Sequence, residues 1–123
     1  KFINIVVEVK TLLGPKDLMT TLLKIEEKLG RKRFKKNAPR TCDIDIIDYK
    51  REKINLDFGN LQLQIPHKSL ADRNFVLYPL KEICPNWSHP LNNFSIDFLI
   101  NNLKNKNYGI TKLSQSDINF YVE

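Results

Sequence analysis

The sequence predicts one α+β domain of 123 residues, in which an antiparallel sheet is covered by helices on one face. Three patterns support this expectation. Apolar residues alternate over residues 2–10, repeat at helical spacing over residues 15–29, and alternate again over residues 41–49 and 61–65. Because these patterns interleave without a regular βαβ repeat, an α+β sandwich fits better than a parallel sheet.

The composition is ordinary for a globular protein, with 41% hydrophobic and 28% charged residues. We find no apolar run as long as a membrane span and no signal-peptide pattern, so we expect no membrane partner. Cys42 and Cys84 lack the spacing of a metal site, and we expect a reducing, cytoplasmic location. The net charge of +6 favours anionic partners such as nucleotides, nucleic acid or phosphate-bearing metabolites.

The first two elements follow from local spacing. Residues 2–10 are expected to form a strand, with Asn4 on one face and the buried apolar residues on the other, namely Ile3, Ile5, Val7 and Val9. A helix should begin at Gly14-Pro15, because proline is tolerated in the first turn, and should end at Gly30.

The rest of the chain alternates between loops and short elements. Residues 31–38 carry five positive charges and predict a basic loop, and an acidic strand follows at residues 41–49. A hairpin is expected from residues 54–56 and 61–65, with helical turns at residues 69–73 and 79–83, the second starting at Pro79. Ser95 can cap a helix that runs to about Lys104, with Phe98, Leu99 and Leu103 for packing. The polar tail, residues 104–123, is not assigned.

The acidic strand contains the pair Asp43 and Asp45. Side chains alternate along a strand, so the two carboxylates share one face while Cys42, Ile44 and Ile46 share the other. Neighbouring carboxylates can remain ionised together if a cation offsets their repulsion, and Mg²⁺ suits such oxygen ligands. Two solvated aspartates on an edge strand are the alternative.

Two runs of residues resemble one known family. Residues 30–45, with Gly30-Arg31-Lys32-Arg33 and Pro39-Arg40-Thr41-Cys42-Asp43-Ile44-Asp45, are similar to the first signature of the 6-hydroxymethyl-7,8-dihydropterin pyrophosphokinases. Residues 65–85, from Ile65-Pro66-His67 through Arg73-Asn74-Phe75 to Pro85, are similar to the second. The resemblance covers about residues 2–103 in consistent order.

The resemblance implies a ferredoxin-like fold and transfer of pyrophosphate from ATP to 6-hydroxymethyl-7,8-dihydropterin in folate biosynthesis. It implies that Asp43 and Asp45 hold two Mg²⁺ ions and act in catalysis together with Arg31 and Arg40. The ATP contacts that it implies are Arg31, Arg33, Arg40, His67 and Arg73. The pterin contacts that it implies are Asn4, Phe75 and Phe2.

The resemblance also shows departures from the family. The family's amino-terminal strand, helix and second strand are missing, so we expect this segment alone to be inactive. Asn37-Ala38 stands where the family usually has Trp-Gly. Fusion to other folate enzymes is a possible arrangement.

Two other classes of function stay open from the sequence. Residues 31–36 could contact phosphates in a basic nucleic-acid-binding module, although no aromatic stacking pattern supports a nucleic-acid partner. The second alternative is an inactive homologue with a structural role.

Overall fold

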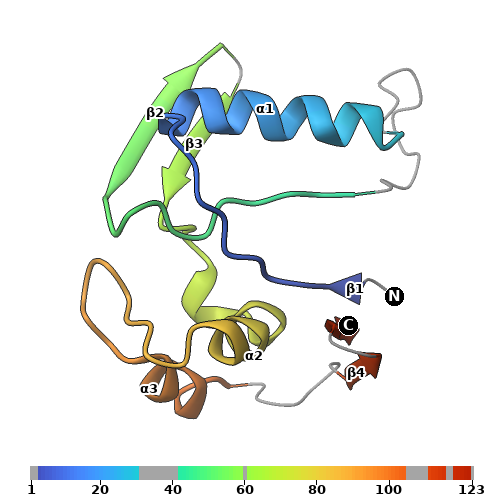
Figure 1. Ribbon diagram of the computed structural model, residues 1–123. Coiled ribbons are helices and arrows are strands. Elements are labelled where there is room, and N and C mark those ends of the chain that lie inside the picture. Colours follow the sequence, from blue (N-terminus) through green and yellow to red (C-terminus); the bar gives the residue numbers. More distant parts are fainter. Residues whose placement is uncertain (1–2, 31–41, 60, 105–110, 116–117, 123) are drawn as a thin grey trace. The chain divides into compact units, whose positions relative to one another are not determined.

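The computed structural model in Figure 1 describes residues 3–30, 42–59, 61–104, 111–115 and 118–122. The chain divides into two compact units, Thr11–His67 and Lys1–Lys10 with Lys68–Glu123. Both units contain helices and antiparallel strands, which confirms the α+β class and the antiparallel pairing.

Helix α1 (Pro15–Lys28) confirms the first expected helix. Pro15 lies in its first turn, where the missing N–H has no partner to lose, and Asp17 favours the positive end of the helix dipole. After the helix, Gly30 takes a φ of 106°, a left-handed conformation that glycine adopts without steric cost. The helix therefore stops where the glycine predicts.

The hairpin of strands β2 (Ile54–Phe58) and β3 (Leu61–Ile65) is also confirmed, and it is longer than expected. The strands pair antiparallel, with Leu56 opposite Leu63. A buried cluster of Tyr49, Leu63 and Ile65 packs against partly buried apolar side chains from α1, from the hairpin and from the chain between them, namely Leu18, Met19, Ile46, Ile54 and Leu56. This cluster joins α1 to the hairpin.

The strand expected at residues 2–10 is much shorter in the structure. Strand β1 comprises only Ile3–Asn4, paired with β5 (Ile118–Val122). The face expected to be buried is exposed, since Ile5, Val7 and Val9 are 53%, 67% and 65% accessible. Period-two spacing predicts an extended backbone, but it does not determine whether one face is buried. Burial requires a neighbouring element, and the described residues place none over the side chains of Ile5, Val7 and Val9.

The other unit contains a 3₁₀ turn, η1 (Leu70–Asp72), followed by helix α2 (Asn74–Ile83). The turn was predicted, but the helix begins five residues before Pro79, so that proline lies inside it. Pro79 cannot donate to the carbonyl of Phe75. Burial of Leu77 and Leu80 on one face offsets that loss and extends the helix toward its amino end.

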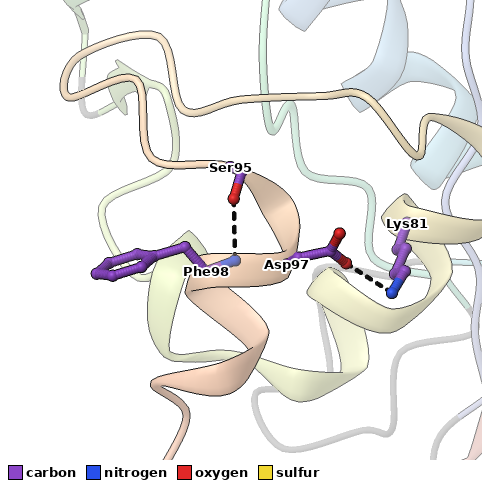
Figure 2. Close-up of polar contacts among 4 residues, drawn as sticks. All are labelled: Lys81, Ser95, Asp97 and Phe98. Carbon is purple, nitrogen blue, oxygen red and sulfur yellow. Dashed lines mark hydrogen bonds and ion pairs between the residues drawn. The ribbon is translucent and has the colours of Figure 1, made fainter.

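Helix α3 (Ile96–Asn101) starts at the predicted cap. Ser95 Oγ accepts a hydrogen bond from the Phe98 N–H at 3.0 Å, and Lys81 on α2 pairs with Asp97 at 2.6 Å; Figure 2 draws both contacts. Leu99 and Leu103 are buried as expected, but Phe98 is 46% exposed and its ring lies 4.5 Å from that of Phe94.

The unassigned tail contains strands β4 (Thr111–Gln115) and β5, which pair antiparallel and give the sheet order β1-β5-β4. Helix α2 contacts β5. The basic loop predicted at residues 31–38 lies outside the described residues. No helix in the described part of the chain has both the length and the apolar character needed to cross a membrane.

Candidate functional site

The acidic segment, residues 42–48, is extended but belongs to no strand of the described structure, which corrects the strand expected at residues 41–49. The alternation itself is as predicted. Asp43 and Asp45 are exposed, whereas Cys42, Ile44 and Ile46 are half-buried. The two carboxylates therefore reach solvent on the same side of the segment.

In the described structure, hydrogen bonds from neighbouring elements hold the acidic segment and the residue that follows it, in place of a strand ladder. The Ile44 N–H donates to Glu26 Oε2 on α1 at 2.6 Å. The His67 N–H, just after β3, donates to the Ile47 carbonyl at 3.1 Å. Farther along, Tyr49 Oη donates to the Leu13 carbonyl at 2.6 Å.

These bonds show how the segment runs. Ile44 is bonded near the end of α1 and Tyr49 just before its start, so the segment is antiparallel to the helix, as Figure 1 also shows. The twelve helical residues from Pro15 to Glu26 and five extended residues span similar lengths, about 18 Å and about 17 Å. The extended segment therefore matches the length of the helix that it follows.

The chemistry of the aspartate pair fits a hard cation. Carboxylate oxygens are the donors that Mg²⁺ prefers, and that ion usually takes only one or two protein carboxylates beside water and phosphate oxygens. Among the described residues, no group of three or more His, Cys, Asp and Glu side chains could hold a metal. The aspartate pair matches the number of protein carboxylates that such an ion usually takes.

His67 lies at the end of β3 and is tied through its backbone to Ile47, two residues after Asp45. Its side chain is half-buried, and Pro66 before it is buried. The structure thus places the backbone of His67 next to the acidic segment, and its ATP contact stays a prediction.

The other unit holds Asn4, Arg73 and Phe75. Arg73 precedes the first residue of α2, and its guanidinium carbon lies 5.4 Å from the centroid of the Phe75 ring. This distance is within the range of a cation–π contact. Asn4 pairs with Tyr121 in the β1–β5 ladder and is half-buried. A predicted phosphate contact and a predicted ring contact are therefore neighbours.

Four predicted site residues lie outside the described residues: Phe2, Arg31, Arg33 and Arg40. Their roles stay predictions.

Sequence reasoning missed Glu26. This glutamate is 2% exposed, although it lies near the end of an otherwise amphipathic helix. It follows Leu22 by four residues and Leu23 by three, so it occupies the same face as these half-buried side chains. A charged residue within an apolar helical stripe was the signal that would have identified it.

Comparison with protein families assigns the chain to a family. The family model described as 7,8-dihydro-6-hydroxymethylpterin-pyrophosphokinase matches residues 1–85, a range that includes the acidic segment, His67, Arg73 and Phe75. The chain belongs to this family.

Curated relatives agree with the match. The chain is 43% identical over 90 residues to an Aquifex aeolicus protein named 2-amino-4-hydroxy-6-hydroxymethyldihydropteridine pyrophosphokinase, which covers 73% of this chain and 54% of the relative. A Bacillus subtilis protein of the same name is 44% identical over 84 residues, covering 68% of this chain and 48% of the relative. The chain thus spans about half the length of these two relatives.

A longer relative is the folic acid synthesis protein FOL1 of Dictyostelium discoideum. It is 39% identical over 104 residues, which are 85% of this chain and 15% of that protein. A segment similar to this chain therefore occurs within a much longer polypeptide.

Proposed function

We propose that this chain forms part of an enzyme that transfers pyrophosphate from ATP to 6-hydroxymethyl-7,8-dihydropterin, giving AMP and the pterin diphosphate in folate biosynthesis. One observation carries the proposal: within the region matched by the family model, two exposed carboxylates share one side of a segment that hydrogen bonds hold in place. The names of the relatives describe this reaction.

In this proposal Asp43 and Asp45 hold two Mg²⁺ ions. When bound, the ions neutralise negative charge on the ATP phosphates. Pyrophosphoryl transfer needs positioning and charge stabilisation more than covalent help from the protein. Arginine forks bind phosphate oxygens in two-pronged fashion, a role proposed for Arg73 and for the arginines at positions 31, 33 and 40.

The pterin contacts use different chemistry. Asn4 offers both a donor and an acceptor for the polar edge of the ring. Phe75 and Phe2 offer aromatic faces to the flat heterocycle. His67 is proposed as an ATP contact and not as a general base.

The proposal also covers the fold of the complete domain, its cellular location and its fusion to other enzymes. The ferredoxin-like arrangement implied by the resemblance is proposed for the complete domain. Cys42 and Cys84 form no disulfide in the described part of the chain, and a reducing, cytoplasmic location is part of the proposal. Fusion to other folate enzymes is supported by relatives such as the Arabidopsis thaliana folate synthesis bifunctional protein, of which this chain covers 14%.

The test measures AMP release from ATP, with Mg²⁺ and hydroxymethyldihydropterin. We propose a chimera in which this chain follows the amino-terminal strand-helix-strand segment of the Aquifex aeolicus relative. Asp43→Asn and Asp45→Asn should each lower turnover on the order of a hundred- to a thousandfold, the typical cost of removing a group that stabilises transition-state charge. Asp57→Asn, at an exposed position of β2, is the matched control and should leave turnover unchanged.

Full activity in either aspartate variant would overturn the metal assignment. A chimera that binds Mn²⁺ but has no activity would favour the alternative that this chain is an inactive homologue with a structural role. RNA binding that weakens with salt and survives both substitutions would favour the basic nucleic-acid-binding module.

A further inference from the structure

Glu26 occupies an unfavourable place for a carboxylate. It is 2% exposed, and burial of a carboxyl group is costly unless it has hydrogen-bond partners. It also lies in the last turn and a half of α1, near the negative end of the helix dipole, where acidic residues are disfavoured. Its position therefore calls for a partner that offsets these costs.

The hydrogen bond from Ile44 N–H to Glu26 Oε2 supplies such a partner. At 2.6 Å the bond is short, as expected when a carboxylate accepts it. The donor is the backbone amide between Asp43 and Asp45. A glutamate on the helix thus takes the position that a carbonyl of a neighbouring strand would take in a sheet.

The geometry of an extended chain explains how this hydrogen bond affects the direction of the two aspartates. Successive residues direct their N–H and C=O groups to opposite edges of the segment. The Ile44 N–H donates to Glu26 and the Ile47 carbonyl accepts from His67, and in an extended chain two residues an odd number of positions apart use opposite edges. Contacts at both edges prevent the segment from rotating about its own axis, and that rotation sets the direction of the two aspartates.

We propose that Glu26 is a positioning residue that holds the Asp43 and Asp45 carboxylates in one direction for metal and phosphate binding. The inference rests on the proposed function, because it assigns Glu26 to the same site. Glu26 acts through the Ile44 amide, and the described residues contain no three-carboxylate cluster that would make it a metal ligand.

The experiment uses the whole chain and Mn²⁺ as probe, with free Mn²⁺ measured by electron paramagnetic resonance in the presence and absence of ATP. Glu26→Leu removes the acceptor at similar volume, and Glu26→Gln keeps an acceptor oxygen without the charge. Glu27→Leu and Glu27→Gln, on the exposed side of the same helix turn, are the matched controls. Exchange of the Ile44 amide is followed by NMR in each variant.

We expect Glu26→Leu to weaken Mn²⁺ binding about ten- to a hundredfold, as is typical when a residue that orients a metal ligand is lost. The Ile44 amide should lose its protection in the same variant. Glu26→Gln should bind Mn²⁺ nearly as the parent does and keep the amide protected, and both Glu27 variants should match the parent. If Glu26→Leu fails to fold, Glu26→Asp shortens the reach by one methylene and should weaken Mn²⁺ binding in the same direction.

Two results would overturn the positioning role while leaving the proposed function intact. One is unchanged Mn²⁺ affinity in Glu26→Leu, or in Glu26→Asp if that variant replaces it, despite a deprotected Ile44 amide. The other is a loss of affinity in Glu26→Gln with the amide still protected, which would show that charge and not position matters. If the parent chain binds no Mn²⁺ even with ATP, the proposed metal site fails and the role of Glu26 fails with it.

Discussion

Asp43 and Asp45 share a direction because the backbone between Cys42 and Asp48 is extended, and they keep it because groups outside the segment bond to that backbone. The alternation is a property of the local chain and was predictable. The partners are Glu26 and His67, which lie 18 residues before Ile44 and 20 residues after Ile47. Local spacing carries no information about contacts at that separation.

Tyr49 contributes to the same segment through its hydroxyl and its ring. The residue is 8% exposed, its ring lies in the buried cluster, and its hydroxyl donates to the Leu13 carbonyl. Tyr49→Phe should lower the free energy of unfolding by about 1 kcal/mol, because it removes one hydrogen bond and leaves the ring in place. Urea unfolding followed by circular dichroism measures this change.

Leu63→Ala provides the comparison for Tyr49→Phe. Leu63 is 7% exposed in the same cluster, and its truncation should cost about 2–5 kcal/mol. A loss for Tyr49→Phe as large as that for Leu63→Ala would show that the hydroxyl does more than donate one bond.

Phe75 provides a test of the proposed pterin contact. Its ring is half-buried beside the Arg73 guanidinium. Phe75→Leu keeps an apolar side chain but removes the aromatic face, so the Kd for hydroxymethylpterin should rise about two- to tenfold, the equivalent of about 0.5–1.5 kcal/mol of stacking. Quenching of pterin fluorescence by the chimera gives this constant.

Phe98→Leu is the matched control for Phe75→Leu. Phe98 lies on α3, is 46% exposed and has no proposed role. Equal pterin affinity in the parent and in the Phe75→Leu variant would remove Phe75 from the site.

At the scale of elements, the helix boundaries set by nearby capping residues were predicted, and the start of α1 at Pro15 was predicted too, but the start expected at Pro79 was wrong. The Ser95 cap and the Gly30 stop depend on groups within a few residues of the helix, and both occur as expected. The start of α2 at Asn74 depends on burial of Leu77 and Leu80, which outweighs the local preference to begin at Pro79. Tertiary burial therefore explains why the start predicted for this helix was wrong.

The two contacts in Figure 2 should differ in their contribution to stability. Ser95→Ala leaves the Phe98 N–H without its side-chain acceptor and should cost about 1 kcal/mol, whereas Ser95→Asp should retain the cap. Lys81→Ala should cost less, between about 0 and 1 kcal/mol, because the Lys81 and Asp97 side chains are 49% and 61% exposed and water screens the pair. Urea unfolding of the three variants checks the order.

Salt provides the internal check of that comparison. Raising the ionic strength should reduce the difference between Lys81→Ala and the parent and leave the Ser95→Ala difference nearly unchanged. The reverse pattern would contradict the assignment of the cap as the stronger contact.

At the scale of the whole molecule, charge is the property that sequence composition determines directly. The net charge of +6 and the isoelectric point near 9.4 attract anionic ligands from a distance. This attraction does not depend on which basic residue touches the ligand.

We therefore expect the affinity for ATP to fall severalfold as sodium chloride is raised from about 50 to about 200 mM, since salt screens exposed charges beyond about 10 Å. The affinity for hydroxymethylpterin, which is uncharged, should change little over the same range. Isothermal titration of the chimera with each ligand makes the comparison. An ATP affinity that is insensitive to salt would show that only close, shielded contacts matter.

The sequence alone determined the features that depend on neighbours along the chain: the span of α1, the β2–β3 hairpin, the common side of Asp43 and Asp45, and the resemblance to the pyrophosphokinase family. Tertiary structure decided which extended residues become strands. Residues 5–10 and 42–48 have strand-like patterns but no ladder, and the unassigned tail provides β4 and β5. The physical reason is that alternation fixes where side chains point, whereas a strand, or a carboxylate such as Glu26 in place of one, requires a hydrogen-bond partner from elsewhere in the chain.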